Sequence, residues 1–199
     1  MLFRSSNKPL AVIILAAGKG TRMDSDLPKV LHPIGELPMI TRVVQTAQEL
    51  GASRIIPVLG YKHELVQSAL KDEPVECVLQ LQQLGTAHAV MQCRETLHNF
   101  NGNILILYGD VPLITVETLA KLILLHDEQD SLGTILTADL SDPKGYGRVI
   151  RDENGNLSKI VEEKDATEGE RAVQEINSGI YVFKSRSEEH TSELQSRAY

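Results

Sequence analysis

A short stretch near the N-terminus combines small residues with cations, a mixture that suits the binding of an anion. The sequence AAGKGTR, residues 16–22, follows an apolar run and includes Gly18, Gly20 and Arg22. Glycines let a backbone approach a ligand closely, and cations offset the charge of phosphate groups. The stretch has neither the ending of a Walker phosphate loop nor the spacing of the dinucleotide fingerprint. It therefore indicates a phosphate-binding turn of another type, with an ordinary strand-to-helix turn and solvated cations as the alternative.

A second candidate cation, Lys29, lies in the continuation SDLPKVL. Pro28 fixes a bend in the backbone beside it, and Val30 and Leu31 can anchor the segment in the core. We therefore expect this lysine to be held on a supported element and to neutralise phosphate charge together with Arg22. The alternative for either residue is a surface cation.

Two polar side chains stand at the ends of later apolar runs. Asp110 ends NILILYGD, beside Gly109, and a carboxylate at that position suits a Mg²⁺ ion shared with substrate phosphates. The alternative is a cap for the turn before Pro112. Gln80 ends VECVLQ and can offer an acceptor and donors to the edge of a base, although it could also be a solvated residue.

The elements that must position these residues alternate between two hydrophobic patterns. Helical spacing of apolar residues predicts helices over 40–50, 63–70, 86–97 and 116–126. Apolar runs between them predict strands over 10–15, 54–60, 75–80, 103–110 and 133–140. Such alternation implies crossover connections and a parallel sheet covered on both faces. Ligands of these sheets bind beyond the carboxyl ends of the strands, which is where the glycine stretch, Gln80 and Asp110 fall.

The pattern changes after Gly147. Two short runs flank Asn154-Gly155, a hairpin signal, and residues 174–184 predict a last strand. The expected fold is therefore α/β, a Rossmann-like, doubly wound, mainly parallel sheet with a β-rich C-terminal addition.

Composition narrows the function classes. The chain has 199 residues, a formal net charge of -7 and 42% hydrophobic residues, which argues against a general nucleic-acid binder. Its two cysteines form no disulfide framework, and no signal peptide or stretch of transmembrane length is present. We expect a cytoplasmic protein that does not insert into membranes.

The last residues break with the rest of the chain. The peptide RSEEHTSELQS, residues 186–196, is the translation of a common sequencing-library adapter, and we interpret 186–199 as a non-native tail. A natural polar tail is the alternative. On the first interpretation, residues 1–185 form one domain that is incomplete at its C-terminus.

Six ordered motifs carry a family resemblance. LAAGKGTRMDSDLPKVLHP is similar to the signature of the sugar-phosphate nucleotidyltransferases, which share a glycosyltransferase-A-like fold. VLQLQQLGTAHAV, LYGDVPLI, DPKGYGRVI, IVEEKDAT and QEINSGIYVF follow in the order of the bacterial bifunctional UDP-N-acetylglucosamine diphosphorylase/glucosamine-1-phosphate N-acetyltransferases. The resemblance covers nearly all of residues 10–184.

The resemblance implies a uridylyltransferase that makes UDP-N-acetylglucosamine and pyrophosphate from UTP and N-acetylglucosamine-1-phosphate, with Mg²⁺. This reaction feeds the synthesis of peptidoglycan and lipopolysaccharide precursors. Full-length family members also acetylate glucosamine-1-phosphate and form homotrimers through a β-helical domain whose repeats are absent from these residues. Two alternatives stay open: a related nucleotidyltransferase with another base or sugar, and an inactive fragment that binds UTP.

The resemblance also assigns roles residue by residue. Arg22 and Lys29 are expected to be catalytic, Asp110 to hold the metal, and Gln80 to contact the uracil edge. An asparagine beyond these 199 residues is the implied second metal ligand, so the chain is expected to be an impaired enzyme. His88 is assigned no role beyond packing or capping. The remaining expected substrate-binding residues are Leu15, Ala16, Ala17, Gly18, Gly85 and Thr86 around the base and ribose, Gly109 beside the metal ligand, and Tyr108, Gly147, Glu162 and Asn177 on the sugar side.

Overall fold

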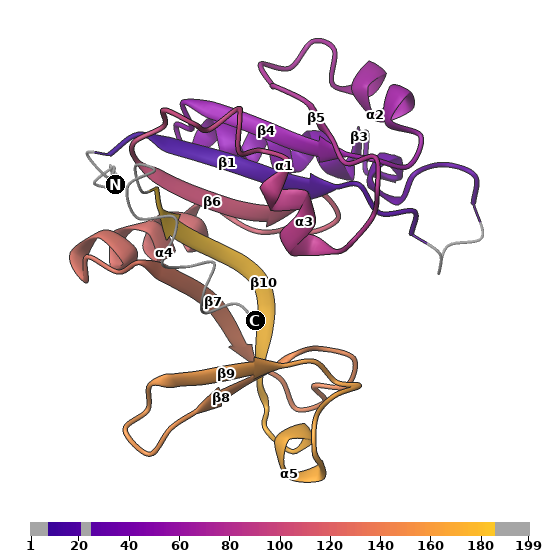
Figure 1. Ribbon diagram of the computed structural model, residues 1–199. Helices are drawn as coiled ribbons and strands as arrows, with labels where there is room; N and C mark the ends of the chain where they lie inside the picture. The colour runs from indigo at the N-terminus through magenta and orange to yellow at the C-terminus, as the bar shows by residue number, and fades with distance from the viewer. Residues whose placement is uncertain (1–7, 21–24, 186–199) are drawn as a thin grey trace.

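The computed structural model describes residues 8–20 and 25–185, and one twisted sheet runs through it (Figure 1). Its strand order is β5-β4-β1-β6-β10-β8-β9, with β7 paired to β10. The first four strands in this order are parallel to one another, as expected. They are β5 (Val78–Leu79), β4 (Arg54–Leu59), β1 (Leu10–Ala16) and β6 (Asn103–Tyr108).

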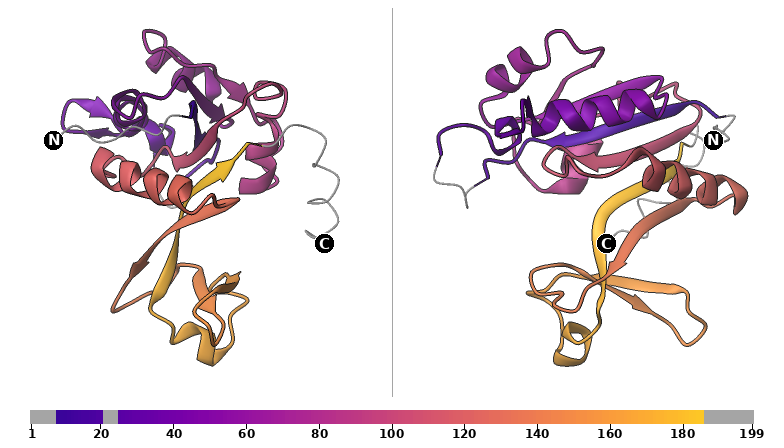
Figure 2. Two further views of the ribbon diagram at one scale, coloured as in Figure 1. Left: turned by 90° about the vertical axis from the view of Figure 1, so that its left-hand side faces the viewer. Right: turned by 180° about the vertical axis from the view of Figure 1, so that it is seen from behind.

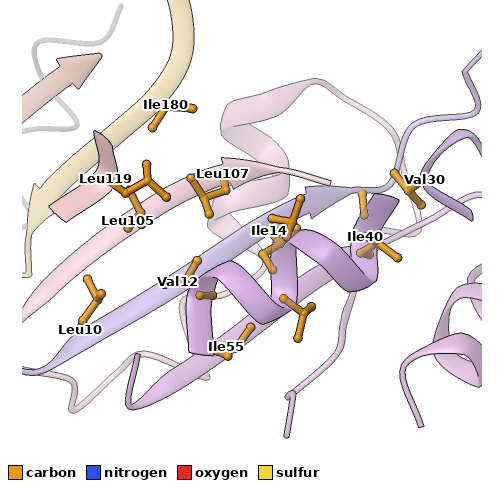
Figure 3. Packing of buried hydrophobic residues seen from close by; sticks show 14 of the residues in the cluster. Leu10, Val12, Ile14, Val30, Ile40, Ile55, Leu105, Leu107, Leu119 and Ile180 are labelled. Carbon is orange, nitrogen blue, oxygen red and sulfur yellow. The ribbon is translucent and has the colours of Figure 1, made fainter. Parts of the chain in front are cut away.

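Strand β1 is an uninterrupted run of apolar residues, as is typical of the parallel half of the sheet. All seven of its residues are buried, because helices cover both faces of the sheet. On one face, Val12 and Ile14 pack with Ile40 of α1 (Met39–Glu49) and Leu119 of α4 (Val116–Glu128), as Figure 3 shows. Helix α2 (His63–Ala69) adds Val66 to the same cluster.

The opposite face is covered by α3 (Thr86–Met91). Ala89 and the following Cys93 pack there against Ile13 of β1 and Ile106 of β6. Helices on both faces confirm the doubly wound α/β arrangement.

The second half of the sheet is antiparallel and is organised by one long strand, β10 (Glu175–Lys184). β10 runs antiparallel to β6, β7 (Gly133–Asp139) and β8 (Arg148–Arg151). The predicted hairpin is present, with β8 paired to β9 (Leu157–Val161). Figures 1 and 2 show β8, β9 and the short helix α5 (Glu168–Arg171) extending away from the parallel half, to which β7 and β10 connect them.

A bulge in β10 between Asn177 and Tyr181 brings this strand against Tyr108. Gly179 in the bulge has φ +80°, and a Cβ there would lie 2.5 Å from Cε2 of Tyr108. Only glycine therefore combines this backbone conformation with this contact.

We expect Gly179→Ala to destabilise the fold by roughly 2–5 kcal/mol, the sum of a left-handed backbone penalty and a steric overlap in a packed site. Gly155→Ala is the matched control, because Gly155 also has φ +80° but no atom lies within 4 Å of the position that an added methyl group would take. Urea unfolding of both variants separates the two terms. Equal shifts in the unfolding midpoint would show that the Tyr108 contact costs nothing.

The structure corrects several element boundaries. Helix α3 ends at Met91, not at residue 97, and three-residue turns continue the chain through bonds such as Cys93 N to Val90 O (3.0 Å). The third strand is reduced to Val78–Leu79. The sequence patterns did not predict η1 (Lys29–Leu31), β2 (Pro33–Ile34), β3 (Leu37–Pro38) or α5.

Two expectations from the sequence concern the C-terminal tail and the absence of a membrane-spanning segment. The tail 186–199 lies outside the described residues, so its non-native origin stays a prediction. Within the described ranges, every helix is too short or too polar to cross a bilayer.

Candidate active site

A cavity of about 540 Å³ opens at the carboxyl edge of the parallel strands. It is where the alternation of strands and helices predicts a ligand site. Ten expected site residues line it: Leu15, Ala16, Ala17, Gly18, Lys29, Gln80, Gly85, Thr86, Tyr108 and Asp110. Gly109 lies buried beneath this lining, where its N–H donates to the carbonyl of Leu15 (2.9 Å).

The two glycines of the N-terminal turn have different structural roles. Gly20 has φ +66°, and a Cβ there would lie 2.8 Å from Cβ of Lys29, so the turn and the lysine segment can approach only through a glycine. Gly18 is not in the left-handed region, and no atom lies within 4 Å of the position of an added Cβ. Its backbone is therefore open to the cavity.

Lys29 is held on the short helix η1, as its sequence context predicts. The N–H of Leu31 donates to the Pro28 carbonyl (2.9 Å), and Val30 is buried in the main core. The Lys29 ammonium contacts Asp110, with Nζ 2.6 Å from Oδ2. Two residues that were assigned to different tasks thus form an ion pair at the cavity wall.

This ion pair is reached by solvent. The side chains of Lys29 and Asp110 are 41% and 29% exposed. Ion pairs at such exposure contribute little net stability, since water and salt screen them. Each partner can therefore be exchanged for a ligand group at small cost.

Asp110 suits a hard divalent cation. Mg²⁺ in proteins commonly takes one or two carboxylates and completes its shell with water and substrate phosphates. Asp110 offers such a carboxylate beside the open glycine turn. Within residues 8–20 and 25–185, no group of three or more His, Cys, Asp or Glu side chains is placed to form a protein-only metal site. These donors therefore fit a metal ion that is held jointly by the protein and a ligand. Such an ion would compete with the Lys29 ammonium for the Asp110 carboxylate.

Gln80 lines the cavity and is 4% exposed. Its backbone N–H donates to the Leu59 carbonyl (2.7 Å), which fixes it beside β4. Its side-chain Nε2 donates to the Gly85 carbonyl (3.1 Å) and lies 2.9 Å from Nδ1 of His88. The side chain is not a solvated one, which removes that alternative.

Gln83 was missed in the sequence. It lines the same cavity, and its Nε2 donates to the carbonyl of Ala17 (2.9 Å), joining the segment after β5 to the glycine turn. Its position three residues after Gln80 was the available signal, but exposed polar residues at such spacing are common. Its contact depends on a residue 66 positions away.

The expected sugar-side residues form a group of their own. The N–H of Asn177 donates to the Gly147 carbonyl (2.8 Å), and a Cβ on Gly147 would lie 3.4 Å from Oε1 of Glu162. Tyr108 links this group to the cavity, because it lines the cavity and packs against Gly179 in the same strand as Asn177. Gly147, Glu162 and Asn177 are thus brought together but do not line the main cavity.

Asn177 is oriented by its own strand. Its Oδ1 accepts hydrogen bonds from the Gly179 N–H (2.8 Å) and the Tyr181 hydroxyl (3.0 Å). Burial raises the pKa of Tyr181, which keeps that hydroxyl protonated as a donor. Both of these bonds are accepted by the oxygen of the Asn177 side-chain amide.

A buried arginine supports the loop that carries Gly147. Arg148 is 1% exposed, and its Nη2 lies 2.7 Å from Oε2 of Glu163. The hydrogen bond from Arg148 lowers the pKa of Glu163, and the same carboxylate accepts the Gly145 N–H (3.2 Å). The loop before β8 is therefore tied to the segment that follows Glu162.

The remaining predicted catalytic residue, Arg22, lies outside the described residues. Its role stays a prediction.

Known proteins resemble the chain in both sequence and fold. The family model described as "Nucleotidyl transferase" matches residues 11–198. The bifunctional protein GlmU of Geotalea uraniireducens (strain Rf4) is 50% identical over 177 residues, which are 88% of this chain and 39% of that protein. The bifunctional protein GlmU of Streptococcus uberis (strain ATCC BAA-854 / 0140J) is 51% identical over 174 residues, 87% of this chain and 38% of that protein.

A solved structure of UDP-glucose pyrophosphorylase in complex with UDP-glucose has the same fold. It superposes with a TM-score of 0.70 at 19% identity and covers 88% of this chain and 76% of its own. The chain spans about two fifths of the length of the curated relatives. The relatives confirm the resemblance carried by the motifs, and from the match over residues 11–198 and the identity of about half, the chain belongs to the nucleotidyl transferase family.

Proposed function

We propose that this chain is the nucleotide-binding part of a uridylyltransferase that makes UDP-N-acetylglucosamine and pyrophosphate from UTP and N-acetylglucosamine-1-phosphate. One observation carries the proposal. A single cavity combines an amide suited to a base edge, Gln80, with an open glycine turn and the charged pair Lys29–Asp110. Its relatives, half identical in sequence, are named as bifunctional proteins of this family, which supports the same assignment.

The proposed reaction transfers a uridylyl group. A phosphate oxygen of N-acetylglucosamine-1-phosphate attacks the α-phosphorus of UTP, a new P–O bond forms, and the bond from the α-phosphorus to the bridging oxygen breaks. Pyrophosphate leaves with the electron pair of that bond. The nucleophile is already an anion, so no general base is required, and catalysis is mainly alignment and charge stabilisation.

Lys29 is the described residue best placed for that stabilisation. Its ammonium lies at the cavity wall on a segment anchored by Val30, so it can be offered to the phosphates without reordering the loop. In the structure it neutralises Asp110, and on substrate binding it exchanges that carboxylate for phosphate oxygens. Arg22 is proposed to share this work.

Asp110 is proposed to hold Mg²⁺ together with substrate phosphates. When bound, the ion supplies positive charge that reduces the repulsion between the two anionic substrates. The protein's own contribution is to keep a carboxylate at the strand edge, where Gly109 lets β6 end close to Val30 and Ala16.

The sugar side of the proposed site is the group around Tyr108. Glu162 and the amide nitrogen of Asn177 can bond hydroxyl or acetamido groups, while Gly147 leaves room between them. The acetyltransferase activity and the homotrimer implied for full-length family members concern sequence beyond these residues. The cytoplasmic location also stays a proposal.

Pyrophosphate release tests the proposal. The assay uses a panel of nucleoside triphosphates and sugar-1-phosphates, with this chain and with a longer one that continues after residue 185 as its relatives do. Highest release by the longer chain with UTP and N-acetylglucosamine-1-phosphate supports the proposal. Preference for another pair indicates a related nucleotidyltransferase, and UTP binding without release indicates a binding module.

Base selection gives a prediction for Gln80. We expect Gln80→Ala to lower the preference for UTP over CTP by roughly 10- to 100-fold, and to lower the rate with UTP by less. A site that hydrogen-bonds one base rejects another by leaving its own buried groups unpaired, and truncation removes that penalty. Competition between UTP and CTP measures the preference.

Gln83→Ala is the matched control, because Gln83 lines the same cavity but bonds the backbone of Ala17. It is expected to leave the base preference within about 3-fold of the parent, since it removes no base contact. An unchanged preference in Gln80→Ala would move base recognition to the backbone around Gly85.

A further inference from the structure

The side-chain amide of Gln80 is held by both of its N–H bonds. The Gly85 carbonyl can only accept a hydrogen bond, so the Gln80 atom 3.1 Å from it is Nε2 and not the oxygen. The same Nε2 lies 2.9 Å from Nδ1 of His88. An amide nitrogen carries two hydrogens, and these two contacts use both.

This arrangement fixes the form of His88. Its Nδ1 must accept the second hydrogen of Gln80, so the imidazole proton is on Nε2. The Gln92 side-chain Nε2 donates to the backbone carbonyl of His88 (3.0 Å) and lies 3.2 Å from the ring Nε2. Of the two amide nitrogens beside the ring, that of Gln80, 2.9 Å from Nδ1, is the closer.

The atom of Gln80 left for the cavity is then Oε1. Gln80 lines the cavity, and no described side chain donates a hydrogen bond to this oxygen. The cavity therefore presents an acceptor at this point. An acceptor pairs with the imide N–H of a uracil ring and faces a lone pair on the corresponding ring nitrogen of cytosine.

We infer that His88 is a positioning residue for base selection, which acts by keeping the oxygen of Gln80 toward the cavity. The inference rests on the proposed function and deepens it. Without an acceptor at position 88, only the Gly85 carbonyl holds Nε2, and the amide can rotate so that this nitrogen turns to the cavity. The same side chain then offers a donor, which suits cytosine.

Binding of UTP and CTP to the 199-residue chain, measured by titration calorimetry, tests this role. His88→Leu keeps the bulk of the side chain but has no acceptor, and it is expected to lower the UTP-over-CTP affinity ratio by about 10-fold. His88→Asp restores an acceptor near the position of Nδ1 and is expected to keep the ratio within about 3-fold of the parent. Met91→Ala alters an exposed residue of the same helix and serves as the control for helix packing.

A second readout needs no nucleotide. The side-chain amide protons of Gln80, identified in NMR spectra by their absence from Gln80→Ala, report the two hydrogen bonds directly. One of them is expected to shift in His88→Leu and to return toward its parent position in His88→Asp. If His88→Leu does not fold, His88→Ala replaces it in both measurements.

The outcomes separate the inference from the proposed function. A parent that prefers UTP, together with an unchanged ratio and unmoved Gln80 amide signals in His88→Leu, overturns the positioning role alone. A parent that binds UTP and CTP equally overturns the proposed base assignment, and the inference with it. A lowered ratio that His88→Asp does not recover also overturns the inference, since packing would then explain the loss.

Discussion

Lys29→Ala is expected to lower pyrophosphate release by roughly 10²–10³-fold, the scale for loss of one preorganised charge stabiliser. The substitution removes the described cation that lies at the cavity wall on an anchored segment. Its partner Asp110 is then left without a counter-charge and repels the substrate phosphates, which adds to the loss. Turnover is measured in the longer chain with UTP and N-acetylglucosamine-1-phosphate.

The fold should survive this change, because the Lys29 side chain is 41% exposed and Val30 supplies the anchor. Thermal unfolding of Lys29→Ala against the parent checks that point. Lys121→Ala removes an exposed lysine of α4, whose Nζ lies 2.7 Å from Oε1 of Glu117, and serves as the charge-matched control. Turnover of Lys29→Ala within a few-fold of the parent would remove Lys29 from the catalytic residues.

Asp110→Asn is expected to have effects of opposite sign with and without metal. With Mg²⁺, turnover falls, and the Mg²⁺ concentration for half-maximal rate rises by roughly 10-fold or more. That is the scale for loss of a residue that only hydrogen-bonds to a metal ligand, and loss of the ligand itself is expected to cost at least as much. Without metal, UTP is expected to bind the Asp110→Asn variant at least as tightly as it binds the parent. The substitution removes a negative charge beside the phosphates and frees Lys29, which Asp110 holds at 2.6 Å.

Metal titration of the rate and metal-free calorimetry with UTP measure the two effects. Asp142→Asn, a change in an exposed turn where the carboxylate accepts the Lys144 N–H (3.3 Å), controls for net charge. Identical Mg²⁺ curves for Asp110→Asn and the parent would mean that Asp110 is only a turn residue. Weaker metal-free binding would mean that the ion pair with Lys29 supports the nucleotide site instead of competing with it.

The parallel half of the fold was predictable because its signal is local. Strands such as β1 are buried on both faces and read as uninterrupted apolar runs, and Gly51, with φ +77°, ends the helix before β4 as expected. The gathering of Gln80 and Asp110 in one cavity also followed from the sequence. Parallel strands end at one edge, so residues that follow them meet there.

The contacts within the cavity were not predictable in the same way. Lys29 and Asp110 are 81 positions apart, and their pairing depends on the side-chain conformations of two partly buried residues. The role inferred for His88 depends on which atom of the Gln80 amide faces it, which no pattern of residue types encodes. From the sequence alone, a histidine on a short helix indicates a packing or capping residue, because its hydrogen-bond partners are not known.

For the antiparallel half, the sequence predicted the hairpin and the last strand, but not where they lie relative to the cavity. The turn at Asn154-Gly155 signals the hairpin, whereas the approach of β10 to Tyr108 at the cavity wall comes from the bulge at Gly179. The sugar-side residues were accordingly assigned by resemblance to a family, not by spacing.

The position of β10 in the chain has a consequence for the order of folding during synthesis. Strands β1, β4, β5 and β6 pair with one another, so the parallel half can form while later residues are still being added. The β8–β9 hairpin forms locally but joins the sheet through Ile176 of β10, which is translated after both. The wall proposed to bind the base can thus take shape on the ribosome before the wall proposed to bind the sugar, and β10, the last of the described strands, brings the two together.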